Sequence, residues 1–263
     1  MHKTVQLEFA NSAKIILESD DNVVGLAVGG SWLTDEIDEF SDLDLIMVTK
    51  EKISGDKEIM IEYAKRLGNF LSGFTGDHVG EPRLLICLYG DPILHVDIKF
   101  LTPGEFHSRV ETPVILLDRD GQLGDVIRHS MPQFPHPDYQ WIEDRFWIWV
   151  HYTLLKIGRG ENLEAFDFFG FLRMIVFGPL LHIKNGNLPR GVRKVETGLK
   201  KEDLDFLKRT IPQYDRQSLL DSLRTSVSLY RELRASLFDK EVRLQEATEQ
   251  QVMKYFDDIE KRK

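Results

Sequence analysis

A proline-rich segment separates two stretches of this sequence that have different periodicities. Three prolines lie within PQFPHPD, at positions 132–138, and such a segment forms a stiff connector rather than a helix or strand. Short apolar runs of strand length occur before it, whereas only patterns with the helical period follow it. We therefore expect an α+β domain over residues 1–134, with a mixed sheet flanked by helices, and an α-helical bundle domain over residues 135–263.

The first part of the chain contains the strand candidates. Apolar spacing predicts a helix over residues 4–19, and a second predicted helix over residues 56–72 has Asp56 as its N-cap. The candidate strands are the apolar runs at 23–30, 43–49, 83–90, 93–101 and 114–118. The Gly-Asp-Pro sequence at 90–92 predicts a hairpin between two of these runs.

The second part predicts helices throughout. Asp138 is the candidate N-cap of a long helix that Gly158 and Gly160 close. The next predicted helix covers residues 163–184 and is interrupted near Gly178-Pro179, because proline disfavours a straight helix. Further helical periodicity is found at 201–210, 218–238 and 247–263.

The composition argues against several classes of protein. A net charge of −9 disfavours a nucleic-acid binder, because such proteins neutralise phosphates with lysine and arginine. Cys87 is the only cysteine, so no intrachain disulfide is expected, and its apolar neighbours predict a core residue. No apolar run approaches the roughly 20 residues of a membrane span, and the first residues do not resemble a secretory signal. We expect a cytoplasmic protein without nucleic-acid or membrane partners.

Two aspartates on alternate residues are the most informative pattern in the chain. Asp42 and Asp44 flank Leu43 at the start of the predicted strand 43–49. Because strand side chains alternate between faces, the two carboxylates point the same way, while Leu43 and Leu45 point toward the core. Two carboxylates one pleat apart repel each other unless cations or donors lie between them. The pair alone therefore predicts either an acidic surface turn or a site for Mg²⁺ or Mn²⁺.

A glycine–serine turn precedes the two aspartates. Gly29, Gly30 and Ser31 follow a short apolar run, with ten residues between Ser31 and Asp42. Glycines let the backbone approach a ligand closely, and the serine adds a hydroxyl group to the exposed amides of the turn. Such a turn is able to hold the terminal phosphates of a nucleotide while the aspartates hold metal ions.

A third aspartate lies on a later predicted strand. In the run HVDIKF, Val96 and Ile98 share one face, while His95, Asp97 and Lys99 share the other. If this strand lies beside the strand of the first two aspartates, three carboxylates converge. An exposed edge strand of mixed charge is the alternative explanation of Asp97.

The Gly-Gly-Ser turn, the Asp-Leu-Asp-Leu run and the later strand aspartate together resemble the nucleotidyltransferase superfamily with the DNA polymerase β-like fold. The motif resemblance covers residues 23–50 and 93–100. The size and the helical second part resemble the aminoglycoside and lincosamide adenylyltransferases. The resemblance implies a nucleotidyltransferase catalytic domain over residues 1–134 and a helical substrate-binding domain over residues 135–263.

The resemblance also implies roles for individual residues. Gly30 and Ser31 would contact the phosphates of the nucleotide, and Asp42 and Asp44 would bind Mg²⁺, with two ions expected. Asp97 matches the third carboxylate of the family, which completes the metal site in some relatives and is the general base in others. Both roles remain open for Asp97 at this point.

Three further residues are weaker candidates. The segment HYTLLKIGRGE, at 151–161, resembles the lysine-bearing helix that follows the catalytic domain in several of these enzymes. Lys156 would then reach the triphosphate and Glu161 would face the acceptor, unless the two simply form a solvated helix end. Glu81, in a Gly-Glu-Pro loop, is another candidate base.

The implied reaction transfers AMP from ATP to a hydroxyl group of a small molecule and releases pyrophosphate. A cationic aminoglycoside suits an acidic protein and implies a role in antibiotic resistance. Trp141, Trp147 and Trp149 either bind this acceptor or pack within the helix that carries them. A lincosamide, a metabolite or a protein are alternative acceptors. A non-catalytic nucleotide-binding module, such as one component of a toxin–antitoxin pair, is the alternative of a different class.

Overall fold

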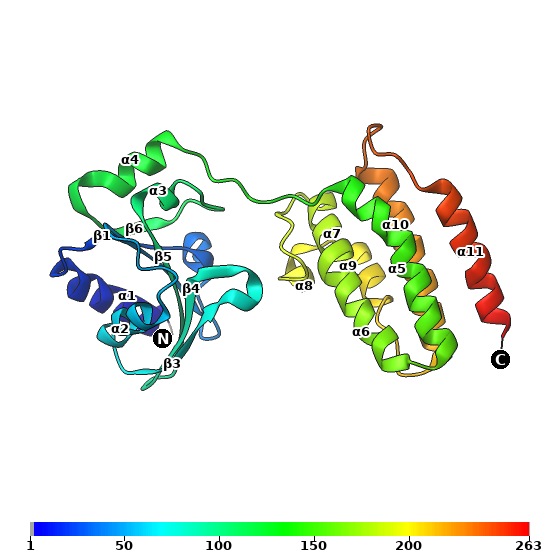
Figure 1. Cartoon of the computed structure of the whole chain (residues 1–263), viewed down its shortest axis with the longest axis horizontal. Coiled ribbons are helices and arrows are strands. Elements are labelled where there is room, and N and C mark those ends of the chain that lie inside the picture. Colours follow the sequence, from blue (N-terminus) through cyan, green and yellow to red (C-terminus); the bar gives the residue numbers. More distant parts are fainter. Residues whose placement is uncertain (1–2, 263) are drawn as a thin grey trace. The chain divides into compact units, whose positions relative to one another are not determined.

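The computed structural model describes residues 3–262, and the chain divides into two compact units between Phe134 and Pro135. Among the described residues, all strands lie in the first unit and the second unit is helical (Figure 1). The α+β fold class predicted from the change in periodicity is therefore confirmed.

The first unit is built on a mixed sheet with the strand order β3-β4-β5-β2-β1-β6. β2 and β5 are parallel neighbours, whereas the other adjacent pairs are antiparallel. The predicted hairpin through residues 90–92 joins β4 to β5. The strands are β1 (Val23–Val28), β2 (Leu43–Thr49), β3 (Phe70–Gly76), β4 (Glu81–Tyr89), β5 (Leu94–Leu101) and β6 (Val114–Asp118).

Helices pack on both faces of this sheet. They are α1 (Lys3–Glu18), α2 (Lys57–Arg66), α3 (Pro103–Phe106) and α4 (Gln122–His129). On one face, Ala13 of α1 and Met60 of α2 belong to the same buried cluster as Leu45 of β2. On the other face, Leu123 of α4 packs with Val48 of β2. Alternation along β2 thus gives each face of the strand its own environment.

The predicted helix over residues 56–72 is wrong in its last part. α2 begins where expected, because the Asp56 carboxylate accepts hydrogen bonds from two amides of the first turn. The helix ends at Arg66, however, and Phe70–Gly76 form the strand β3. Gly68 lies at this change of structure, and β3 is held by its pairing with β4. This pairing is not local in sequence, so periodicity within residues 56–72 did not reveal it.

The second unit is a helical bundle with its own core. Its elements are α5 (Tyr139–Arg159), α6 (Asn162–Leu172), α7 (Gly178–Lys184), α8 (Val195–Gly198), α9 (Lys201–Lys208), α10 (Arg216–Leu237) and α11 (Glu246–Lys261). Asp138 caps α5 by accepting a hydrogen bond from the Trp141 amide, and Gly160 ends it with a φ of 75°. In the core, the rings of Phe146 and Tyr230 stack with centroids 3.6 Å apart. The predicted caps Asp138 and Gly160 of α5 are therefore confirmed, whereas Gly158 lies within the helix.

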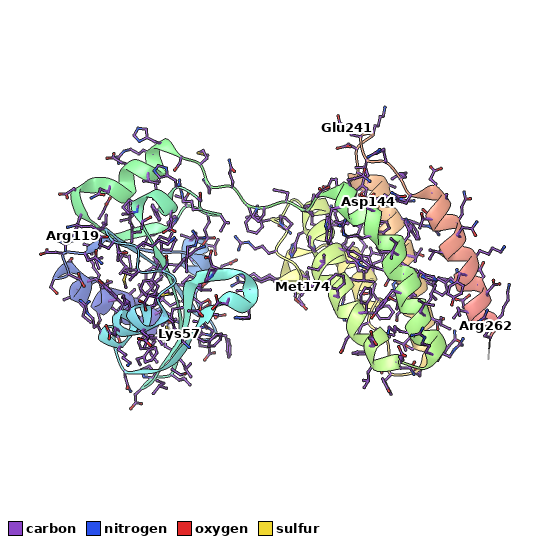
Figure 2. All side chains as sticks on the ribbon, viewed as in Figure 1. Lys57, Arg119, Asp144, Met174, Glu241 and Arg262 are labelled. Carbon is purple, nitrogen blue, oxygen red and sulfur yellow. The ribbon has the colours of Figure 1, made fainter. Side chains whose placement is uncertain are left out.

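The segment Asn162–Lys184 is helical with one irregular turn. Arg173–Phe177 form a π-helical turn between α6 and α7, and Pro179 lies in the first turn of α7. This widened turn takes the place of the interruption predicted near Gly178-Pro179. Met174, labelled in Figure 2, belongs to the turn and is 49% exposed.

The same segment is apolar and long enough to cross a membrane by composition and length alone. Glu164, Asp167 and Arg173 interrupt it, so it contains no uninterrupted apolar run of that length. Phe169, Leu172, Val176 and Leu180 of this segment belong to the buried core of the second unit. Packing within the bundle therefore accounts for its apolar character.

Candidate metal centre

Strand β2 positions the first two carboxylates. Leu43 and Leu45 are 2% and 1% exposed, because they point into the core between the sheet and helices α1 and α2. Asp44 lies between them and is directed to the opposite face, where it is half-buried, and Asp42 directly precedes the strand. The period-two alternation of the strand thus places both aspartates away from the apolar core.

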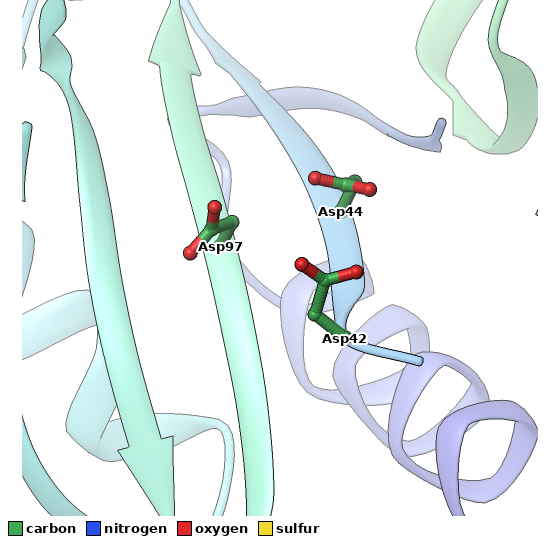
Figure 3. A group of neighbouring side chains, drawn as sticks. All are labelled: Asp42, Asp44 and Asp97. Atoms are coloured by element: carbon green, nitrogen blue, oxygen red, sulfur yellow. The ribbon is translucent and has the colours of Figure 1, made fainter. Parts of the chain in front are cut away.

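The parallel neighbour β5 brings in the third carboxylate. The register of the two strands pairs Asp44 with Asp97. One carboxylate oxygen from each of Asp42, Asp44 and Asp97 can be chosen so that all three lie within 4.8 Å of one another. Figure 3 shows the three side chains directed toward the same space from the two strands. The predicted convergence of three carboxylates is therefore present, and the edge-strand explanation of Asp97 does not apply, since β5 has a neighbour on each side.

The chemistry of this donor set fits a hard divalent cation. Oxygen ligands around an octahedral Mg²⁺ are roughly 3.0 Å apart when adjacent and roughly 4.2 Å apart when opposite, for a metal–oxygen distance of about 2.1 Å. The three carboxylate oxygens lie within 4.8 Å of one another, so small rotations of the side chains would bring them to these separations. Three like charges at this distance repel each other, and a cation between them removes that repulsion.

His95 is an additional neighbour of Asp97. One ring nitrogen of His95 lies 2.9 Å from Oδ1 of Asp97, and both residues share one face of β5. The His95 side chain is about half exposed, at 50%. The His95 side chain therefore contacts both Asp97 and solvent.

The Gly29-Gly30-Ser31 turn lies against Asp44. The Gly29 amide donates a hydrogen bond of 3.0 Å to the Asp44 carbonyl oxygen. Gly30 has a φ of 63°, and a Cβ atom there would lie 1.8 Å from Oδ2 of Asp44. Gly30 and Ser31 begin a 3₁₀ turn that extends to Thr34. The structure thus brings the turn and the aspartates together, as the spacing of the sequence motif requires.

Glu111 is a residue of this site that sequence analysis missed. It lies in the loop before β6, and its Oε1 atom accepts a hydrogen bond of 2.8 Å from the Gly30 amide. A Cβ atom at Gly29 would lie only 2.6 Å from the same oxygen. The glycine turn is therefore held between the carboxylates of Asp44 and Glu111. No local sequence signal identifies Glu111, because 81 residues separate it from Gly30.

Glu81 is paired with two cations. Its carboxylate receives two hydrogen bonds from Arg83, of 2.6 and 2.7 Å, and lies 2.7 Å from the Lys99 ammonium group. The hydrogen bonds from Arg83, followed by the interaction with Lys99, lower the pKa of Glu81 to about 2. A carboxylate with so low a pKa is a weak proton acceptor, so this pairing disfavours Glu81 as the general base.

Lys156 and Glu161 lie in the second unit and are paired with each other. The Lys156 ammonium group is 2.9 Å from Glu161 and 3.0 Å from Glu164, and it lies over the ring of Tyr152. The hydrogen bonds that Lys156 donates to Glu161 and then to Glu164 raise the pKa of Lys156. The two residues thus form ion pairs at the C-terminal end of α5. This arrangement corresponds to the helix end that the sequence offered as the alternative to a binding role.

The three tryptophans of α5 differ in their environments. Trp147 is 1% exposed and belongs to the core. Trp141 is 39% exposed, and its ring meets that of Trp149 edge to face at 5.5 Å. Arg145 lies over the Trp141 ring at 4.3 Å. Packing is therefore the role of Trp147, whereas Trp141 has an accessible ring.

Cys87 is a core residue, as predicted. It is 2% exposed and packs in the cluster between the sheet and helices α1 and α2. Burial raises the pKa of its thiol to about 12. The thiol is thus protonated at neutral pH, so Cys87 is not suited to nucleophilic chemistry.

Comparison with known proteins gives structural similarity only. No family model matches the chain, and no curated protein is similar to it in sequence. Among solved structures, it is similar to a nucleotidyltransferase-like protein from Exiguobacterium sibiricum 255-15, with 12% identity over 88% of this chain and 73% of that chain and a TM-score of 0.35. It is also similar to an aminoglycoside 6-adenyltransferase from Bacillus subtilis, with 16% identity over 97% of both chains and a TM-score of 0.42.

Proposed function

We propose that this protein is a Mg²⁺-dependent nucleotidyltransferase that moves AMP from ATP to a hydroxyl group of a small molecule. The observation that carries the proposal is the convergence of Asp42, Asp44 and Asp97 beside the turn that contains Gly30. Acidic clusters are common on protein surfaces, but this one lies beside a glycine turn whose Gly30 amide donates to the carboxylate of Glu111, so the turn suits an anion. A metal cluster next to an anion-binding turn fits a metal–nucleotide complex.

The proposal assigns each of these residues a task. Mg²⁺ in nucleotide sites usually takes one or two protein carboxylates together with substrate phosphates, and Asp42 and Asp44 would supply them. The Gly30 amide and the Ser31 hydroxyl group would hold the phosphates, and Lys156 would add a positive charge from the second unit. When bound, the metal would neutralise negative charge on the phosphate oxygens.

The proposed reaction is an in-line substitution at phosphorus. The acceptor hydroxyl oxygen forms a bond to the α-phosphorus as the bond from that phosphorus to the bridging β-phosphate oxygen breaks. Pyrophosphate leaves with the electron pair of the broken bond, and the hydroxyl proton passes to a carboxylate. With Asp42 and Asp44 engaged by the first ion, Asp97 is left to accept this proton or to hold a second ion. Glu161 is the alternative proton acceptor.

The acceptor we favour is a cationic aminoglycoside, because the chain carries a net charge of −9 and opposite charges favour binding. This acceptor implies that the protein acts in the cytoplasm in antibiotic resistance. A lincosamide, a metabolite or a protein would use the same transfer chemistry. These acceptors differ in charge and ring structure, so a panel of compounds separates them directly.

The test is incubation of the full chain with Mg²⁺, ATP labelled at the α-phosphate and a panel of aminoglycosides and lincosamides. We expect label to appear on one class of acceptor, and we expect Asp42→Asn combined with Asp44→Asn to abolish this transfer. Asp21→Asn is the matched control, because the Asp21 side chain is fully exposed. Undiminished transfer by the double variant would contradict the proposal.

Binding and turnover are separated by a second measurement. Calorimetric titration with a non-hydrolysable ATP analogue, with and without Mg²⁺, reports nucleotide binding alone. Mg²⁺-dependent binding without transfer to any acceptor would favour the non-catalytic nucleotide-binding module over the enzyme.

A further inference from the structure

A polar cavity lies in the first unit, beside the loop that leads from β5 to β6. Its volume is about 510 Å³, and its polar lining comes from His107, Ser108, Arg109, Ser130 and Gln133. His107, Ser108 and Gln133 are exposed, whereas Arg109 is buried. None of these residues belongs to the cluster of aspartates or to the glycine turn. The cavity is therefore a separate feature of the fold.

The buried cation of this cavity has neutral partners only. Arg109 is 9% exposed, and its two terminal nitrogens donate hydrogen bonds to the hydroxyl group and the carbonyl oxygen of Ser130, at 2.6 and 2.5 Å. Its Nε atom is buried and has no hydrogen-bond acceptor. Within residues 3–262, no carboxylate pairs with Arg109, whereas Arg66 of the same unit contacts Asp20 at 2.6 Å.

A buried guanidinium group without a counter-ion is costly. Removing a charge from water is unfavourable unless an opposite charge or a full set of hydrogen bonds replaces the lost hydration. Ser130 supplies two acceptor atoms, and a guanidinium group has five N–H donors. An oxyanion in the cavity would supply the missing negative charge.

The remaining donors suit a tetrahedral anion better than a flat one. Both terminal nitrogens of Arg109 already donate to Ser130, so part of the planar fork that would pair with a carboxylate is in use. Further donors come from Ser108 and His107, which are separate side chains on the exposed rim. We propose that this cavity is an oxyanion site that binds a phosphate group, with Arg109 as its principal ligand.

Two sources of the phosphate group have this chemistry. One is the phosphate chain of a nucleotide or the pyrophosphate derived from it, because Val110 of the cavity directly precedes Glu111, which contacts the Gly30 amide. The other is a free phosphate ion or a separate phosphorylated molecule. The site itself stands apart from the proposed enzymatic function, since its cation and donors are side chains outside the cluster of aspartates and the glycine turn.

The test is calorimetric titration of the full chain with inorganic phosphate in EDTA, which removes divalent metal. We expect one phosphate to bind per chain, and we expect Arg109→Gln to weaken this binding at least about tenfold, since a charge-assisted hydrogen bond and a counter-charge are lost. Arg66→Gln is the matched control and is expected to leave phosphate binding unchanged, because Arg66 already pairs with Asp20.

Arg109 also links two loops through Ser130, so a test of binding needs variants that leave this link intact. Ser108→Ala and His107→Asn change exposed side chains of the cavity rim instead, and each is expected to weaken phosphate binding about threefold, within the range of a single hydrogen bond. Circular dichroism of each variant checks that the fold is retained.

The outcomes separate the sources and the two proposals. A loss of affinity in Arg109→Gln for both inorganic phosphate and a non-hydrolysable ATP analogue supports the site and assigns it to the nucleotide. A loss for inorganic phosphate alone supports it as a site for a separate anion. Absence of phosphate binding by the unaltered chain, or equal binding by all cavity variants, overturns it. Failure of AMP transfer does not affect this test, because the titration contains neither metal nor acceptor.

Discussion

Gly30 follows β1 and lies directly against the carboxylate of Asp44 in β2. Its φ of 63° lies in the left-handed region, and a Cβ atom at this position would meet Oδ2 of Asp44 at 1.8 Å. Backbone conformation and side-chain contact therefore both require glycine here. Gly80 also has a left-handed φ, of 76°, but nothing lies within 4 Å of a Cβ atom there.

These two glycines give a matched pair of variants. We expect Gly30→Ala and Gly80→Ala each to lower the free energy of unfolding by about 1–2 kcal/mol, the cost of a left-handed non-glycine residue. Gly30→Ala must also displace the Asp44 carboxylate, so we expect it alone to weaken Mg²⁺-dependent nucleotide binding about tenfold or more. Urea unfolding and calorimetric titration measure the two effects. Equal nucleotide binding by both variants would show that the contact with Asp44 is unimportant.

Glu111 places a negative charge where the proposed function needs a phosphate. Its carboxylate accepts a hydrogen bond from the Gly30 amide, which a phosphate oxygen would have to replace. We expect Glu111→Gln to tighten binding of a Mg²⁺–ATP analogue about tenfold, because the displaced group is then neutral. Glu8→Gln, at an exposed position of α1, is the control with the same change of charge. Weaker binding by Glu111→Gln would instead identify Glu111 as a structural support of the turn.

Strand alternation, a local property that the sequence displays, placed Asp42 and Asp44 on one face, and the family resemblance added Asp97 as the third carboxylate. Glu111 and Arg109 were not predicted, because their roles depend on contacts with Gly30 and Ser130 across the fold. Loop residues have no periodicity from which such contacts can be inferred. A side chain whose direction is set within one strand was predictable from the sequence, whereas a side chain whose role depends on contacts between distant segments was not.

The neighbouring strands β4 and β5 are connected by a charged cluster on one face of the sheet. Glu81 and Arg83 come from β4, and Lys99 comes from β5. The cluster lowers the pKa of Glu81 to about 2 from an ordinary value of 4.5. A lowered carboxylate pKa stabilises the fold above the ordinary value, and this stability is lost as the pH falls toward the folded-state value.

We therefore expect Glu81→Gln to lower the free energy of unfolding of the first unit by about 1–2 kcal/mol at pH 7, a value reduced for partial solvation of the cluster. The difference from the unaltered chain should shrink as the pH falls from about 4.5 toward 2, because protonation removes the same charge. Denaturant unfolding at several pH values measures it. A difference independent of pH over this range would contradict the role of the charge.

Helices α5, α10 and α11 are joined around a fully buried carboxylate. Glu143 of α5 is 0% exposed and accepts hydrogen bonds from Tyr230 and Arg234 of α10, at 2.5 and 3.2 Å. It also accepts one from the Gln245 amide, at 2.9 Å, directly before α11. A buried carboxylate is stable only with such a complete set of partners.

We expect Glu143→Ala to lower the free energy of unfolding of the second unit by about 3–5 kcal/mol, because several buried donors lose their acceptor. Glu260→Gln removes a more exposed partner of Arg224 and should cost less than about 1 kcal/mol. Thermal or denaturant unfolding followed by circular dichroism compares the two variants. Similar losses in both would contradict the importance of the buried network.

The two units of the whole molecule have separate cores. One core lies within the bundle, and two lie on the faces of the sheet. Because each unit buries its own apolar residues, we expect the pieces 1–134 and 135–263 to fold separately and to unfold cooperatively. Circular dichroism and denaturant titration of each expressed piece check this. Loss of cooperative unfolding in either piece would show that its fold depends on the rest of the chain.

Local patterns in the sequence determined much of this protein: the change from strands to helices near PQFPHPD, the caps at Asp56 and Asp138, and the shared face of Asp42 and Asp44. Each follows from steric and hydrogen-bonding rules that act over a few residues. The tertiary structure alone decided that β5 lies parallel to β2 and that β3 is a strand. It also decided that Glu111 contacts the glycine turn and that Arg109 lines the polar cavity. These features depend on contacts between residues far apart in sequence, whose geometry is set by the packing of the whole unit.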